Sequence, residues 1–174
     1  MAKVYTKIGD FGCTMIKNAK VGKDSLHINA QGAIDELQSS LDLVRLYAPK
    51  SYVSMIEKIQ DKLRFLAGEI AGYITDEAML VTIEDVMHLE EVIDQMANVV
   101  PNKFVRFNSP ASVHLNEARV RTRALERFMV PLLKEEVVRK DVYKYINRLS
   151  DFFFVLSYKF EFTIEDFSTF GNSN

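Results

Sequence analysis

Residues that break regular backbone structure are scarce in this chain, and their scarcity limits the folds it can adopt. The 174 residues include only seven glycines and four prolines, about half the share of these residues in average proteins. A fold of many short strands needs glycine, proline and other turn residues at frequent intervals. The sequence therefore favours long helices joined by few connections.

Apolar residues recur at steps of three and four along five segments, which is the spacing of one helix face. Helices are predicted at about 29–47 and 51–74, from Thr82 to Pro101, from Ser109 to Pro131, and from Asp141 to about 160. Ser109 and Pro110 suit an N-cap and a first helical residue. Thr82 and Asp85 are a capping-box candidate. Pro131 is expected to kink or end the fourth helix, because proline removes a backbone hydrogen bond.

The segments on either side of these helices have a different character. Residues 1–28 show no helical period, and Gly9 and Gly12 mark turns where the backbone can approach a ligand closely. Residues 161–174 are rich in phenylalanine but aperiodic. The sequence thus predicts a single domain over 1–174. It comprises an ordered glycine-containing loop (1–28), an all-α, up-down bundle of five helices (29–160) and a tail (161–174).

Composition excludes several classes of protein. The 22 basic and 24 acidic side chains leave a net charge of −2, which does not suit broad electrostatic binding to nucleic acid or anionic membranes. No apolar run approaches the roughly 18 residues of a membrane span, and no signal-peptide core opens the chain. Cys13 is the single cysteine, so an intrachain disulfide is impossible. We expect a cytoplasmic protein with neither nucleic acid nor membrane as a partner.

Two polar groups are candidates for binding a polyanion. The loop around Gly9 and Gly12 could offer backbone N–H groups and nearby lysines to a phosphate chain, or it could be a solvated surface turn. On the fourth predicted helix, four charged residues share one face about two turns long; they are Arg119, Arg123, Glu126 and Arg127. Guanidinium forks match phosphate oxygens, although a solvated face of Arg–Glu pairs gives the same pattern.

The last predicted helix carries Asn147 and Asp151 one turn apart, away from its apolar stripe. They could bind a sugar hydroxyl, hold an arginine, or simply form an exposed polar face. The three histidines are scattered without metal-ligand spacing, so no metal site is predicted.

Four stretches, read together, resemble the PduO-type ATP:cob(I)alamin adenosyltransferases. Residues 6–14, Thr-Lys-Ile-Gly-Asp-Phe-Gly-Cys-Thr, are similar to the family's Thr-Lys-Thr-Gly-Asp-x-Gly-x-Thr opening. Lys23-Asp24 and residues 32–38, Gly-Ala-Ile-Asp-Glu-Leu-Gln, are similar to its Lys-Asp and Gly-Thr-x-Asp-Glu-Leu-Asn. Ala118-Arg119, Arg123 and Glu126-Arg127 match its Ala-Arg-x-x-x-Arg-Arg-Ala-Glu-Arg. Residues 145–151, Tyr-Ile-Asn-Arg-Leu-Ser-Asp, nearly reproduce its Tyr-Leu-Asn-Arg-Leu-Ser-Asp. The stretches follow the family's order over residues 3–158.

This resemblance implies a ferritin-like, cobalamin adenosyltransferase-like bundle that assembles as a homotrimer with active sites between subunits. It implies transfer of the 5′-deoxyadenosyl group of ATP to the cobalt of cob(I)alamin, with release of triphosphate. ATP, Mg²⁺ and a corrinoid are therefore expected as cosubstrate, cofactor and substrate. A reductase and a cobalamin-dependent acceptor enzyme are expected as partners.

The resemblance also implies roles for individual residues. The ATP site would use Thr6, Lys7, Ile8, Gly9, Thr14, Lys23, Arg123, Glu126, Arg127 and Asn147. Asp35 would pair with Arg119 of a neighbouring subunit beside the corrinoid, and these two residues with Arg123 and Glu126 are the expected catalytic set. Phe104 would crowd the lower face of the corrin ring. Asp151 occupies the position of the family's second polar residue on the last helix.

Some positions depart from the family pattern and keep other functions open. The glycines that usually follow Thr14 are absent, Ala124 replaces the second arginine of the Arg-Arg pair, and the loop after Phe104 is one residue short. A catalytically weakened homologue that carries or senses ATP or corrinoid is therefore the alternative. A helical scaffold without ligands is a third interpretation, against which the retained Lys7 and Lys23 weigh.

Overall fold

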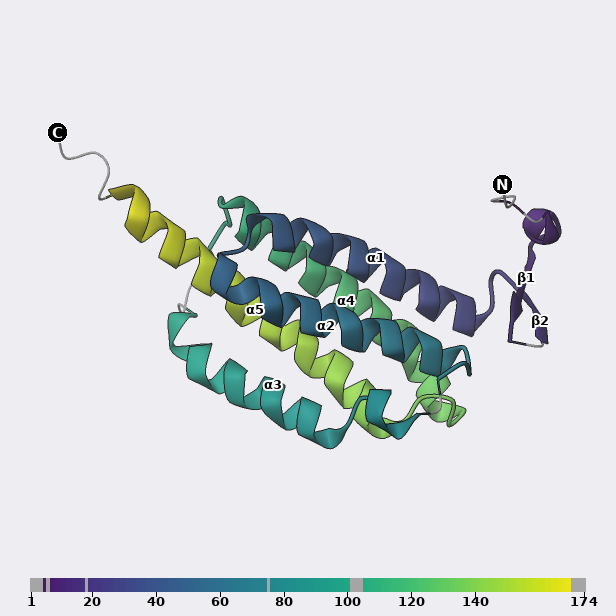
Figure 1. Cartoon of the computed structure of the whole chain (residues 1–174). Coiled ribbons are helices and arrows are strands. Elements are labelled where there is room, and N and C mark those ends of the chain that lie inside the picture. Colours follow the sequence, from purple (N-terminus) through teal and green to yellow (C-terminus); the bar gives the residue numbers. More distant parts are fainter. Residues whose placement is uncertain (1–4, 6, 18, 75, 101–104, 170–174) are drawn as a thin grey trace.

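The computed structural model describes residues 5, 7–17, 19–74, 76–100 and 105–169 (Figure 1). Five long helices dominate: α1 (Leu26–Tyr47), α2 (Lys50–Ile70), α3 (Ile83–Met96), α4 (Pro110–Lys134) and α5 (Lys140–Thr169). The shorter elements are the 3₁₀ helices η1 (Ile8–Phe11), η2 (Glu77–Met79) and η3 (Ala97–Val99), and the strands β1 (Cys13–Ile16) and β2 (Ala19–Gly22). In the described part of the chain, no helix combines the length and apolar character that a membrane span requires.

The predicted five-helix architecture is confirmed, with one amendment to the all-α class. Between η1 and α1 the chain forms a small antiparallel hairpin, in which Cys13 pairs with Gly22 and Ile16 with Ala19. Its strands have only four residues each, and an alternation of apolar and polar residues over so short a stretch is too weak a signal to predict a hairpin from the sequence.

The helices pack through the apolar stripes that the sequence predicted. α1 lies between α2 and α4, while α5 packs against both α4 and α3 (Figure 1). The largest fully buried side chains include Phe152, Phe153 and Phe160 of α5, together with Leu37 and Leu41 of α1. Burial of these stripes is the main driving force for the bundle.

Helix α2 ends earlier than the spacing of its apolar residues suggests, at Ile70 rather than 74. Gly72 adopts the left-handed conformation with φ 73°. Its N–H donates to the Glu69 carbonyl, and the N–H of Tyr73 donates to the Gly68 carbonyl. This pair of bonds is the Schellman motif, which terminates helices at a left-handed residue.

Helix α4 was expected to kink or end at Pro131, but it continues to Lys134. Its actual end resembles that of α2: Glu136 has φ 58° and donates its N–H to Leu133, while Val137 donates to Leu132. The left-handed residue therefore sets the end of the helix, one turn beyond the proline. The other end agrees with the sequence, since the Ser109 hydroxyl accepts the N–H of Ser112 as an N-cap.

Helix α5 runs to Thr169, beyond residue 160 where an aperiodic tail was predicted. Glu161 lies in this extension and is buried, with only 1% of its surface exposed. Its carboxylate accepts the backbone N–H groups of Asn108 and Ser109 at the start of α4. A carboxylate interrupts the apolar pattern, and for this reason the sequence gives no sign that the helix continues.

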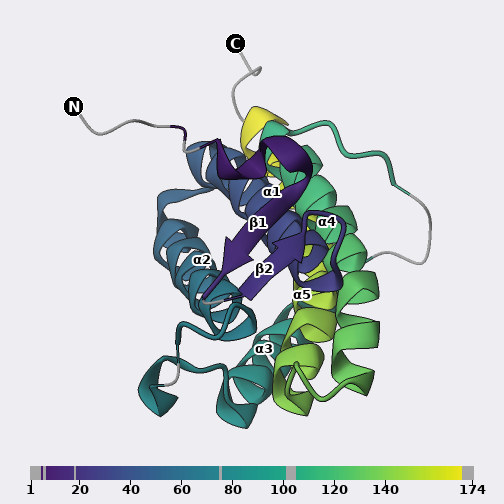
Figure 2. The same ribbon diagram turned by 90° about the vertical axis from the view of Figure 1, so that its right-hand side faces the viewer.

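The hairpin lies beyond the end of the bundle at which α1 and α5 begin and α2 and α4 end (Figure 1). Viewed along the bundle, β1 and β2 stand in front of the helix ends (Figure 2). The glycine-containing segment is thus held at one end of the molecule.

Candidate active site

One surface of the bundle is formed where α4 and α5 run side by side, and its centre is Glu126. The Oε1 atom of Glu126 accepts a hydrogen bond from the Tyr143 hydroxyl at 3.1 Å and from Asn147 Nδ2 at 3.0 Å. Glu126 is on α4, whereas Tyr143 and Asn147 are one turn apart on α5. Packing of the two helices thus brings together two residues that the sequence assigned to one site.

Asn147 is also held from its other side. Its Oδ1 atom accepts a hydrogen bond from Arg148 Nη1 at 3.0 Å. Arg148 in turn donates from Nε to Glu90 of α3 at 2.7 Å and lies 3.5 Å from Asp151. The pKa of Arg148 is raised, mainly because its guanidinium donates a hydrogen bond to Glu90. Of the roles considered for Asp151, the structure supports that of holding an arginine.

Arg123 and Arg127 occupy the same face of α4 as Glu126 and are exposed. Among the described residues, neither guanidinium makes a hydrogen bond or an ion pair. Two unpaired guanidinium groups beside an ordered carboxylate and amide form a surface ready to accept an anion.

The same surface changes character towards the start of α4. Arg119 donates from Nε to Asn116 at 3.0 Å, and its guanidinium carbon lies 5.9 Å from the centre of the Phe154 ring. Phe154 makes an edge contact with Tyr158 at 5.1 Å, and Tyr158 makes another with Phe107 at 5.0 Å. The surface therefore has a charged end and an aromatic end.

The N-terminal residues form a second group of candidates on the hairpin and its flanking turn. Lys7 has the left-handed φ of 62° and precedes η1. A Cβ atom at Gly9 would lie 2.8 Å from the Lys23 ammonium, so the end of that flexible side chain lies across the turn and a larger residue at Gly9 would displace it. The Lys23 N–H also donates to the Gly12 carbonyl at 2.8 Å. Thr14 is half-buried in β1, while Ile8 is about half exposed.

Within one chain the two groups remain apart. The hairpin stands beyond the end of the bundle (Figure 1), and in the described part of the chain no hydrogen bond or ion pair joins it to α4 or α5. Asp35 is exposed on α1, whereas the adjacent Glu36 forms the ion pair between α1 and α4, with Arg121 at 2.7 Å. Two predicted site residues, Thr6 and Phe104, lie outside the described residues.

Comparison with known proteins decides the family. Residues 4–160 match a protein family described as cobalamin adenosyltransferase. The chain belongs to this family. A corrinoid adenosyltransferase of Bacillus subtilis is 36% identical over 87% of this chain and 83% of its own length. One from Citrobacter freundii is 32% identical over 90% and 94%.

Solved structures of the cobalamin adenosyltransferase family share the fold. An arginine-to-lysine variant of the PduO-type ATP:corrinoid adenosyltransferase from Lactobacillus reuteri, complexed with ATP, superposes with a TM-score of 0.82. It is 32% identical, over 94% of this chain and 96% of that one. A phenylalanine-to-alanine variant of the same enzyme, complexed with cobalamin and ATP, gives a TM-score of 0.81 at 29% identity, over 94% and 96%.

Some residues of the adenosyltransferase surface were not singled out from the sequence: Tyr143 and Arg148 at its charged end, and Phe154 and Tyr158 at its aromatic end. Tyr143 precedes Asn147 by one helical turn, so the period of the helix could have placed both on one face. Arg148 follows Asn147 directly and reaches back to its amide, a contact that sequence spacing does not indicate.

Tyr143 should make the stability of the protein depend on pH in alkaline solution. Burial and the hydrogen bond to Glu126 raise the pKa of Tyr143 above its usual value. The neutral phenol thus stabilises the fold below about pH 10, and this contribution is lost as the pH rises through the higher folded pKa. We expect the free energy of unfolding, measured with denaturant, to fall less steeply above about pH 10 in Tyr143→Phe than in the wild type. Equal slopes would contradict this assignment.

Proposed function

We infer that this protein transfers the 5′-deoxyadenosyl group of ATP to the cobalt of a reduced corrinoid. A cobalt–carbon bond forms, the bond between C5′ and the triphosphate oxygen breaks, and triphosphate leaves with the electron pair. The observation that carries this inference is the continuous α4–α5 surface. Its charged end (Arg123, Glu126, Arg127 and Asn147) suits a nucleotide. Its aromatic end, where Arg119 lies over the partly exposed Phe154 and the buried Tyr158 supports that ring, suits an apolar macrocycle.

Reduced corrinoid is itself a strong nucleophile, so the protein need not supply a base. Its contribution is to hold C5′ in line with cobalt, which converts a bimolecular encounter into a positioned one. Glu126 is suited to this task because Tyr143 and Asn147 both bond to Oε1. Its second oxygen, Oε2, makes no hydrogen bond among the described residues and can accept one from a ribose hydroxyl.

The leaving triphosphate gathers negative charge as the bond to C5′ breaks. We assign its stabilisation to Arg123 and Arg127, together with Lys7 and Lys23, which lie before and after the hairpin, from a neighbouring protomer. Cationic donors fixed before the reaction stabilise such charge without reorganisation at the moment of transfer. The free guanidinium groups on α4 and the placement of Lys23 across Gly9 support this assignment.

A homotrimer would supply the neighbouring protomer. The hairpin stands beyond the end of its own bundle (Figure 1), and no hydrogen bond or ion pair joins it to α4 in the described part of the chain, which favours a site completed by a second chain. We propose that Asp35 pairs with Arg119 across this interface beside the corrinoid. Asp35 has no ion pair among the described residues of its own chain, which leaves it available to a neighbour. Phe104 is proposed to crowd the lower face of the corrin ring.

Mg²⁺ is proposed to enter with ATP. Among the described residues no group of three or more histidine, cysteine or carboxylate side chains could hold a metal ion. Mg²⁺ binds readily to substrate phosphates and keeps several waters, so a protein cage is unnecessary. Cationic side chains and Mg²⁺ would then share the charge of the triphosphate.

The chemistry also implies partners on either side of the reaction. Corrinoid must arrive with its cobalt reduced, so we propose a reductase as the supplier. The product carries a reactive cobalt–carbon bond, so we propose a cobalamin-dependent enzyme as the acceptor.

Purified protein mixed with ATP, Mg²⁺ and chemically reduced cobalamin tests the function directly. Formation of the cobalt–carbon bond changes the absorbance of the corrinoid, and we expect this change to require ATP and to repeat over many turnovers. Binding of cobalamin without turnover would indicate a carrier or sensor instead. Absence of both would indicate a helical scaffold.

A further inference from the structure

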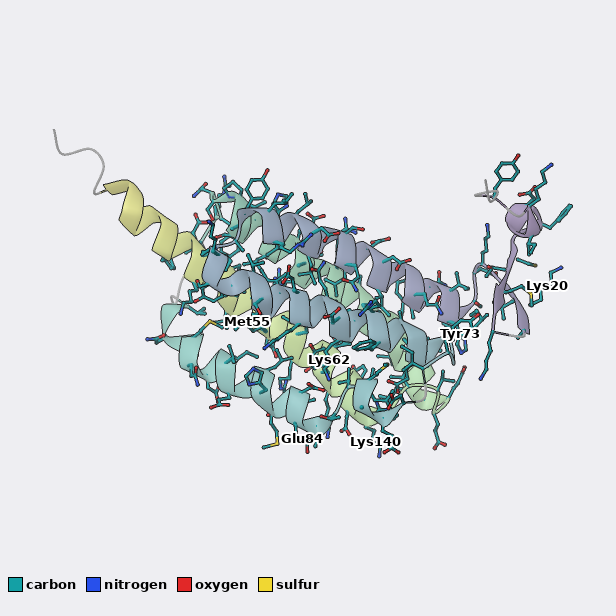
Figure 3. All side chains as sticks on the ribbon, viewed as in Figure 1. Lys20, Met55, Lys62, Tyr73, Glu84 and Lys140 are labelled. Atoms are coloured by element: carbon teal, nitrogen blue, oxygen red, sulfur yellow. The ribbon has the colours of Figure 1, made fainter. Side chains whose placement is uncertain are left out.

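The hairpin that carries Lys23 and Thr14 is attached to the bundle at its turn. The backbone N–H of Lys17, the residue after β1, donates to the hydroxyl of Tyr73 at 2.6 Å. Tyr73 follows α2 and lies at the end of that helix facing the hairpin (Figure 3). In the described part of the chain, this is the one hydrogen bond between the hairpin and the segment that follows α2.

The position of Tyr73 is fixed by the end of its own helix. Tyr73 supplies the N–H that bonds to the Gly68 carbonyl in the Schellman motif, directly after the left-handed Gly72. Its backbone is therefore part of the helix terminus rather than of a free loop. Tyr73 as a whole is 63% exposed, so its side chain reaches the hairpin without being buried in the bundle.

On the side of the hairpin, Lys17 is the residue that meets this terminus. Lys17 has a positive φ of 51°. Its side chain lies over Gly72, where an added Cβ atom would be 3.6 Å from Lys17 Cδ. Strand pairing then transmits the position of Lys17 along the hairpin, since β1 and β2 are paired from Ile16–Ala19 to Cys13–Gly22. Lys23 follows the last of these pairs.

We propose that Tyr73 is a positioning residue for nucleotide binding, because it fixes the turn of the hairpin and thereby the placement of Thr14 and Lys23 toward the phosphates. This inference rests on the proposed function. Tyr73 itself touches no substrate in this scheme and acts through the Lys17 N–H. Phenylalanine at position 73 keeps the ring and the helix end and removes only the acceptor.

The test is the affinity of Tyr73→Phe for ATP alone, measured by calorimetric titration, followed by steady-state kinetics. We expect ATP to bind about fivefold more weakly and the KM for ATP to rise by a similar factor, the usual size of one neutral hydrogen bond. The KM for cobalamin and the melting temperature should not change. Tyr47→Phe is the matched control, because the Tyr47 hydroxyl has no hydrogen bond among the described residues and lies at the opposite end of α1.

A second measurement tests the hydrogen bond between Lys17 and Tyr73 in the absence of any ligand. Hydrogen exchange at the Lys17 amide should be faster in Tyr73→Phe and unchanged in Tyr47→Phe. Unchanged ATP affinity in Tyr73→Phe would overturn the proposal while leaving the transferase function intact. A wild-type protein that neither binds ATP nor turns over would instead remove the proposed function on which the proposal rests.

Discussion

Replacing Arg123 with alanine is expected to lower turnover by about 100- to 1000-fold, the usual cost of losing one donor to a developing anion. Arg123 is exposed and has no ion pair among the described residues. Its charge is therefore free for the triphosphate and is not needed to hold the bundle together. The measurement is the rate of cobalt–carbon bond formation at saturating ATP and cobalamin, with the melting temperature recorded alongside.

Arg64→Ala is the matched control for this change. Arg64 is an exposed arginine on α2 whose one ion pair among the described residues is with Asp61, one turn earlier on the same helix, and it also lies over the ring of the adjacent Phe65. Such surface pairs contribute little to stability, so turnover and melting temperature should both remain close to the wild type. Near-normal turnover in Arg123→Ala would show that the triphosphate is held elsewhere.

The second large effect concerns stability and the buried Glu161. Its Oε1 accepts the Asn108 N–H at 2.8 Å and its Oε2 accepts the Ser109 N–H at 3.1 Å, so one carboxylate serves two backbone donors before α4. Glu161→Ala removes the acceptor of both donors, of which Ser109 is half-buried, and leaves a cavity where the buried side chain of Glu161 lay. We expect the free energy of unfolding to fall by about 3 kcal/mol and the melting temperature by about 6–12 °C.

Two variants separate this role from a general effect of lost charge. Glu91→Ala removes an exposed glutamate of α3 and should leave the melting temperature within about 2 °C of the wild type. Glu161→Gln retains one acceptor oxygen and should fall between wild type and Glu161→Ala. A Glu161→Ala protein as stable as Glu91→Ala would contradict the assigned contacts.

The helices could be predicted because each carries its own periodic signal. The apolar stripes placed five helices, and the caps at Ser109 and Thr82 located two of their starts. The ends of the helices were harder to predict from the sequence. Those of α2 and α4 depend on the left-handed conformations of Gly72 and Glu136, and glutamate gives no warning of such a turn.

The candidate site, too, could be predicted only in part from the sequence. The face of α4 with Arg123 and Glu126 follows from helical period alone, whereas its meeting with Asn147 depends on how α4 packs against α5. Two long-range hydrogen bonds that carry predictions here could not be predicted from the sequence. Tyr73 is 56 residues from its partner Lys17, and Glu161 is 53 from Asn108. Neither pair has a local pattern.

The central claim is that hairpin lysines of one protomer and α4 arginines of another form a single nucleotide site. It is tested most directly by mixing Lys23→Ala and Arg123→Ala, each expected to be almost inactive alone, in equal amounts during assembly. If the site is shared, about a quarter of the interfaces in random trimers combine an intact hairpin with an intact α4. Turnover should then recover to about a quarter of the wild-type rate. Mixed trimers as inactive as the two parents would contradict the account.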